Sequence, residues 1–270
     1  MFWPERALDP GELRRNRLSF TAYGVDGCRT GWLYVAIEPL AGIRWGVPML
    51  ADLVRTVGDS DRIFVDLPIG LPDGAEGRMC DLEARLRLGR RRSSVFPAPI
   101  RAVLGIDNFE DANRASRAAA GKGLSQQAFA IARKVQEVDS LLRRCSKARG
   151  LVREVHPEVY FWALAGETPM SFPKKAKAKA GFRECVAVLG NLRPSVSDEV
   201  CQIARSFPHK HVAWDDIADA FVSALTPSQP LERFRTLPAA PECDRYGSPM
   251  EMVYANVLSS QAVEDFPACR

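Results

Sequence analysis

The chain has 270 residues, of which 46% are hydrophobic and 26% are charged, and its formal net charge is +4. This composition excludes a disordered or fibrous chain, and the length suffices for one large α/β domain or two small ones. The slight positive charge permits a polyanionic partner without requiring one. Seven cysteines are scattered without a C-x-x-C pair, which argues against a disulfide framework and a zinc site and favours a reducing compartment.

The first residues carry charges throughout and lack the apolar segment of a secretory signal, so we predict a polar leader over residues 1–20. No stretch approaches the roughly 18 apolar residues of a membrane span. We therefore expect a cytoplasmic protein without a membrane partner. The sequence leaves the oligomeric state open.

The first half of the chain predicts a sheet that begins with strands joined by turns. Apolar and β-branched runs separated by CRTG and PLAG predict an antiparallel meander. Its strands are expected over residues 21–27, 32–38 and 43–50. A short helix over 51–58 follows, and the nearly continuous apolar run at 63–69 predicts a buried strand.

The next part predicts mainly helices, of which 125–145 shows the clearest 3.6-residue period, with Ser125 as a plausible N-cap. The other helices are expected at 74–92, 109–121, 157–165, 182–190, 196–206 and 214–225, and further strands at 151–156 and 250–255, with an exposed segment at 173–181. The order β-β-β-α-β, then helices, predicts an α/β sheet with helices on both faces. We expect one domain over 21–256 with a helical insertion at about 74–145, and a tail at 257–270.

Two acids interrupt apolar strands of this predicted sheet. Asp26 lies in YGVDG and Asp66 in IFVDLPI, each near the carboxyl end of its strand. Open α/β sheets place their ligand sites at this end of the strands. Because a crossover helix commonly returns the chain beside the first strand, we expect the fourth strand to pair with it in parallel, so that Asp26 and Asp66 face each other.

The segment WDDIADAF at 214–221 adds a third group of acids. Asp216 and Asp219 are three residues apart and share a helical face, as Asp215 and Asp219 do at a spacing of four. Each acid alone has a simpler explanation: Asp26 could cap a turn, Asp66 could end a strand, and Asp215 could be an N-cap. Together, carboxylates in apolar contexts favour a Mg²⁺ or Mn²⁺ site. Two such ions roughly 4 Å apart can activate water for phosphodiester hydrolysis.

The chain resembles the domain-of-unknown-function family 429, predicted nucleases with a ribonuclease H-like fold. The resemblance spans roughly residues 21–256. The segments that carry it include GVDGCRTGW (24–32), VDLPIGLPDG (65–74), RMCDLEARLRLGRRRSSVFPAP (78–99), GLSQQAFAIARKVQEVD (123–139), EVHPEVYFWALAG (154–166), DDIADAF (215–221) and MEMVYA (250–255). The helix at 214–225 is also similar to the last helix of Holliday-junction resolvases.

The resemblance implies a mixed sheet of order 3-2-1-4-5 with a metal site. By position, Asp26 and Asp66 would be the strand ligands, and Asp216 and Asp219 the helix ligands. Ribonuclease H enzymes also carry a catalytic Glu on the first helix, whereas the helix at 51–58 has only Asp52. Another acid must therefore complete the site. Our candidate is Glu158; Glu154 and His156 are alternatives, and for His156 a hydrogen-bonded role at a strand end is the simpler reading.

Two basic segments are candidate contacts for a nucleic-acid backbone. They are RLRLGRRR at 85–92 and PKKAKAK at 173–179. The phosphate contacts would come from Arg87, Arg90, Arg91, Arg92, Lys174 and Lys175. A solvated face is the simpler explanation of such runs, and the first also ends a helix, where cations are favourable.

We expect a nuclease that depends on Mg²⁺ or Mn²⁺ and acts on RNA or DNA. One alternative is a catalytically degenerate nucleic-acid or protein binding module on the same fold, which the missing helix Glu favours. Another is a nucleotide-binding enzyme of the actin-like kind, since those also begin with a Gly-acid-Gly strand. That fold needs two such domains and a second Gly-rich phosphate loop, so we rank it last.

Overall fold

The computed structural model describes residues 19–40, 42–173 and 180–256. Its main sheet has the strand order β3-β2-β1-β4-β5, which confirms the predicted order. The strands are β1 (Ala22–Cys28), β2 (Gly31–Ile37), β3 (Ile43–Gly46), β4 (Arg62–Val65) and β5 (Val152–Glu154). β1, β2 and β3 form an antiparallel meander, while β4 pairs in parallel with both β1 and β5.

Side chains along β1 alternate between two hydrophobic cores. Ala22 packs into one core, and Tyr23 and Val25 pack into the other. A central strand buried on both faces explains why the sequence of β1 is almost entirely apolar. An acid in phase with Ala22 therefore lies on the same face of the sheet as Ala22.

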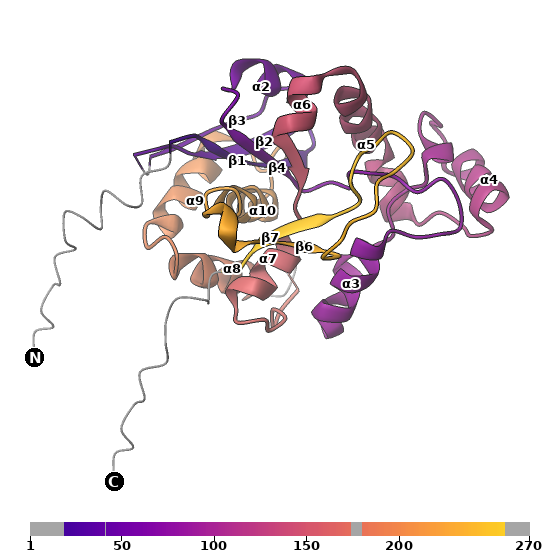
Figure 1. Ribbon diagram of the computed structural model, residues 1–270. Helices are drawn as coiled ribbons and strands as arrows, with labels where there is room; N and C mark the ends of the chain where they lie inside the picture. The colour runs from indigo at the N-terminus through magenta and orange to yellow at the C-terminus, as the bar shows by residue number, and fades with distance from the viewer. Residues whose placement is uncertain (1–18, 41, 174–179, 257–270) are drawn as a thin grey trace, which may run out of the picture.

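Helices cover both faces of the sheet, as predicted. The core on the Tyr23 side is closed by α2 (Leu50–Thr56), α5 (Gln126–Arg144) and α6 (Ser146–Leu151). The core on the Ala22 side is closed by α7 (Pro157–Leu164), α8 (Ala180–Gly190), α9 (Val196–Ser206) and α10 (Trp214–Leu225). Figure 1 shows α2 and α6 above the sheet and α10 below it.

The helical excursion between β4 and β5 begins with α3 and continues through α4 into α5. Its elements before α5 are α3 (Met79–Leu88), the 3₁₀ helices η1 (Gly89–Ser94) and η2 (Arg101–Val103), and α4 (Phe109–Ala120). α3 is shorter than the predicted helix at 74–92, because Gly89, at φ 48°, ends the α-helical backbone. Ser125 caps α5 as predicted, since its Oγ accepts from the backbone N–H of Ala128 at 3.1 Å.

A second, two-stranded sheet was only half predicted. β7 (Met252–Ala255) lies in the expected strand, but its antiparallel partner β6 (Phe234–Leu237) lies in the proline-bearing stretch that showed no strand pattern. Four residues are too few to show alternation. Val253 also pairs with Val155 in parallel, so β7 lies beside the end of β5.

Most of the predicted leader and exposed segment, and all of the predicted tail, lie outside the described residues. No helix in the described part of the chain is long and apolar enough to cross a membrane.

Candidate functional site

Asp26 lies near the carboxyl end of β1, and Asp66 directly follows the neighbouring parallel strand β4. Val25 is in register with Val65, and the backbone N–H of Asp66 donates to the carbonyl of Val25 at 2.8 Å. β4 ends at Val65, earlier than predicted, because the chain turns at once: the N–H of Leu67 bonds back to the carbonyl of Val65. Asp26 is in phase with Ala22, on the face of the sheet that α10 covers.

Gly24 lets α10 lie directly against β1. A Cβ at this position would be 2.0 Å from the backbone nitrogen of Ala224 and 2.1 Å from the carbonyl oxygen of Ala220. No side chain could fit in this space, so the helix backbone rests on the strand. This contact positions Asp219, one residue before Ala220, over the end of β1.

Three carboxylates meet at this point. One oxygen each from Asp26, Asp66 and Asp219 lies within 4.8 Å of the others, and Asp219 is only 8% exposed. The three acids line a cavity of about 580 Å³. Carboxylates crowded in this way repel each other unless a cation lies between them, and hard oxygen ligands favour Mg²⁺ or Mn²⁺. The residues present therefore fit a divalent metal centre.

The other two acids of α10, Asp215 and Asp216, do not lie as the sequence predicted. The carboxylate of Asp216 accepts from the backbone N–H of Ala213 at 2.8 Å and thereby satisfies a donor at the start of the helix. Asp216 is not one of the three clustered acids. Asp215, which the sequence presented only as a helical neighbour of Asp219 or as an N-cap, lines the cavity.

The end of β5 and the segment after it also line the cavity. Glu154, His156 and Glu158 all line it. Glu158 accepts from Arg91 Nη2 at 2.7 Å, while its Oε2 is buried and has no hydrogen-bond partner among the residues that the structure describes. Glu158 thus has one carboxylate oxygen engaged by Arg91 and the other buried, and it is not one of the three clustered acids.

Glu154 belongs to a buried ion-pair network that the sequence did not predict. Arg78, only 1% exposed, donates from Nη2 to both carboxylate oxygens of Glu154 at 2.6 and 2.7 Å and lies 3.5 Å from Asp81. Glu154 also accepts from the backbone N–H of Ile69 at 2.6 Å. These contacts join α3 and the loop after Asp66 to β5.

The same network explains a second group of metal-type ligands. Cys80, Asp81 and Glu154 lie within 4.8 Å of one another, but the guanidinium of Arg78 already supplies their cation. Burial raises the pKa of Glu154 to about 8, against the opposing effect of Arg78. Burial acts to lower the pKa of Arg78, but Glu154 and Asp81 raise it overall, so the guanidinium stays charged.

Lys134 on α5 places a partly buried cation close to the acids, and sequence reasoning missed it. Its Nζ donates to the carbonyl of Gly31 at 2.6 Å and lies 4.3 Å from the centre of the Trp32 ring. A Cβ at Gly27, the residue after Asp26, would be 3.6 Å from this nitrogen. Burial lowers the pKa of Lys134, while Cys28, Glu137, Asp26 and Asp216 act to raise it. The only available signal was a lysine beside the apolar stripe of α5.

The arginines predicted to contact nucleic acid mostly have partners within the chain. Arg87 lies 3.5 Å from Glu83 and near the Trp162 ring, and Arg90 donates to the carbonyl of Pro169. Arg91 pairs with Glu158, as described above, and Arg92 is exposed. Lys174 and Lys175 lie outside the described residues.

The first helix of the sheet region adds no acid to the cluster. Asp52 opens α2 but is half exposed and ion-paired with Arg55. This helix has no Glu, and Asp52 does not take the place of one in the cluster.

Comparisons with known proteins address the family of the chain. Neither the curated proteins nor the solved structures gave a match. A family model described as protein of unknown function (DUF429) matches residues 24–242, which include Asp26, Asp66 and Asp219, most of β1 and all of β2 to β5. This match covers most of the chain, and the chain therefore belongs to the DUF429 family.

Proposed function

We propose that this protein is a divalent-metal-dependent nuclease or phosphodiesterase. The observation that carries the proposal is the convergence of Asp26, Asp66 and Asp219 at the wall of one cavity. Mg²⁺ or Mn²⁺ bound there would supply an activated water and stabilise charge on a phosphate. The sheet order, which ribonuclease H-like nucleases share, and the position of the acids at the carboxyl ends of parallel strands support the same reading.

The surrounding residues have separate parts in this proposal. Asp26, Asp66 and Asp219 hold the metal, and Glu158 completes the site in place of the missing helix Glu. Asp216 stays a predicted ligand whose carboxylate is also engaged at the start of α10. Arg91, Ser93 and Ser94 line the cavity and give a phosphate its first contacts.

Nucleic acid is the proposed substrate, with the wider backbone held by Arg87, Arg90, Arg92, Lys174 and Lys175. Arg87, Arg90 and Arg92 are all exposed, and because Arg90 donates only to a backbone carbonyl in the described structure, its charge is left at the surface as that of Arg92 is. We further propose a cytoplasmic location, which the scattered cysteines support.

Calorimetric titration with Mn²⁺ tests the metal site directly. Wild type should bind Mn²⁺, and Asp66→Asn or Asp219→Asn should weaken binding by at least about tenfold, because each removes one of three charged ligands. Asp216→Asn tests whether Asp216 is a further ligand, since asparagine can still accept from the backbone N–H of Ala213. A loss in Asp216→Asn equal to that in Asp66→Asn would make Asp216 a fourth ligand.

Cleavage assays on RNA and DNA then separate the enzyme from the alternative function. We expect Mn²⁺-dependent products from wild type and none from Asp66→Asn. If oligonucleotides bind with an affinity that falls with salt but no product forms, the catalytically degenerate binding module is the better assignment. Absence of Mn²⁺ binding in wild type would overturn the metal centre itself.

A further inference from the structure

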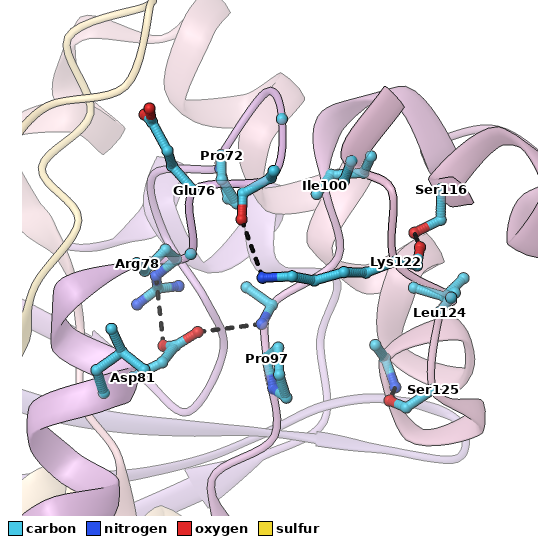
Figure 2. Close-up of a pocket in the computed structure, with 18 of the residues that line it drawn as sticks. Pro72, Glu76, Arg78, Asp81, Pro97, Ile100, Ser116, Lys122, Leu124 and Ser125 are labelled. Carbon is cyan, nitrogen blue, oxygen red and sulfur yellow. Dashed lines mark hydrogen bonds and ion pairs between the residues drawn. The ribbon is translucent and has the colours of Figure 1, made fainter. Parts of the chain in front are cut away.

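A second cavity, of about 520 Å³, lies in the helical excursion away from the three clustered acids. Its walls are the loop at 72–78, the start of α3, the segment at 97–100 and the turn between α4 and α5. In Figure 2, Arg78 and Asp81 stand on one side and Ser116, Leu124 and Ser125 on the other. Asp81 also lines the cavity of the candidate metal site, so the two cavities share this part of their walls. The volume is within the range of small-molecule sites.

Most of the wall is apolar and suits an apolar ligand body. The apolar lining residues are Pro72, Ala75, Leu82, Pro97, Ala98, Ile100, Ala120, Leu124 and Ala128. They belong to four separate segments, and Leu82 is half exposed although it lies on a helix. A ligand that covered this surface would gain the usual free energy of apolar burial.

The charges at the cavity favour an anion. Lys122 extends across it, as Figure 2 shows, and its Nζ makes a long contact of 3.3 Å to the carbonyl of Ala75. Arg85 is a second cation in the wall, and it spends one nitrogen, Nη1, on the carbonyl of Val95. The positive end of the α5 dipole also meets the cavity at Ser125 and Ala128.

The acids of the wall do not cancel this charge. Asp81 is committed to Arg78 and to the backbone N–H of Ala98 at 3.1 Å. The carboxylate of Glu76 is directed away from the cavity in Figure 2. Arg78 Nη1 is buried in this wall and has no hydrogen-bond partner within the described part of the chain. Because Arg78 Nη1 has almost no accessible surface, it adds positive charge behind the wall and makes no direct contact with a ligand.

We propose that this cavity is a second binding site, which takes a small organic anion with an apolar body. The anionic group lies against Lys122, with Arg85 and the start of α5 around it, and the body packs against Leu82, Ile100 and Leu124. The site does not depend on the metal centre, since Asp66 and Asp219 do not line it.

Fluorescence titration with anilinonaphthalene sulfonate, an aromatic anion, tests this site. Wild type should show one saturable site. Lys122→Met should weaken binding about tenfold, the size of one charge-assisted contact, while Lys122→Arg should retain it. Gly77→Trp should also weaken binding at least about tenfold, because Gly77 lines the cavity and a Cβ there meets no atom within 4 Å.

Three controls make the result specific. Lys210→Met removes an exposed lysine elsewhere and should bind the probe as wild type does. Asp66→Asn should also bind it unchanged, which separates this site from the proposed nuclease centre. A cooperative thermal unfolding transition would show that Gly77→Trp is folded. The proposal is overturned if wild type has no saturable site, or if Lys122→Met and Gly77→Trp both bind the probe as tightly as wild type.

Discussion

Lys134 shows how a single residue can change the chemistry of a carboxylate site. Its ammonium group, fixed by Gly31 and Trp32 beside the end of β1, contributes a positive charge near Asp26, which acts with the other acids against the lowering of the Lys134 pKa by burial. A fixed cation at such a place repels an incoming divalent ion and can later stabilise charge on a phosphate. Its position on the Asp26 side of the site makes it a candidate for both effects.

We expect Lys134→Met to bind Mn²⁺ more tightly than wild type, by about tenfold or ~1.4 kcal/mol, because a repelling charge is removed. Cleavage should fall in the same variant. Lys134→Arg, which keeps the charge, should leave Mn²⁺ affinity close to wild type. Calorimetry checks the first expectation, and an affinity that stays equal or drops in Lys134→Met would contradict it.

Residue type and spacing identified some of the acids that form the cluster, but could not distinguish all of them. Asp26 and Asp66 were predictable, because an acid in a strand buried on both faces requires a partner or a cation. Asp216 and Asp219 are equivalent by spacing, yet only Asp219 joins the three clustered acids. The N–H of Ala213 engages Asp216, and such a contact depends on where the helix begins.

The packing of α10 on β1 is the contact between elements that builds the site. At Gly24 the helix backbone and the strand backbone are so close that an added Cβ would overlap the backbone of α10. Any side chain there must push α10 away, and with it Asp219. The geometry of the acids is therefore set by a glycine two residues from Asp26.

Gly24→Ala should destabilise the protein by about 3 kcal/mol, at the upper end for overpacked cores, and should abolish Mn²⁺ binding. Gly150→Ala is the matched control: a Cβ in that position of α6 meets nothing within 4 Å, and alanine should stabilise the helix by about 0.5 kcal/mol. Denaturant unfolding measures both. Equal stability of the two variants would show that α10 is not held as closely as described.

For the whole molecule, the Arg78 network joins the helical excursion to the sheet. One guanidinium faces two carboxylates, Glu154 and Asp81, away from water. Burial, and more weakly the neighbouring carboxylate of Asp81, raises the pKa of the Glu154 carboxyl against the effect of Arg78. Stability should therefore depend on pH through this one residue.

The folded state binds the Glu154 proton more tightly than the unfolded chain, whose carboxyl has its ordinary pKa of 4.5. This stabilisation is complete below pH 4.5 and is lost as pH rises towards about 8. The free energy of unfolding of wild type should therefore fall as pH rises from about 5 to about 8, and that of Glu154→Gln, whose side chain stays neutral, should fall less. Urea unfolding across that range measures the difference, and parallel pH profiles would rule out the assigned pKa.

The family resemblance implied the full sheet order. The sequence pattern by itself determined the antiparallel meander, the parallel pairing of the fourth strand with the first, the helices on both faces, the cap of α5 and the neighbouring places of Asp26 and Asp66. These follow from local periodicity, turn residues and the geometry of a parallel crossover, all of which act over short stretches of chain. Only the tertiary structure decided that Asp219 rather than Asp216 joins these acids, that Lys134 and Arg78 provide cations, and that Arg87, Arg90 and Arg91 have partners within the chain. Those outcomes depend on contacts between segments far apart in sequence, where close approach, burial and charge pairing are set by the packed fold and leave no periodic signal.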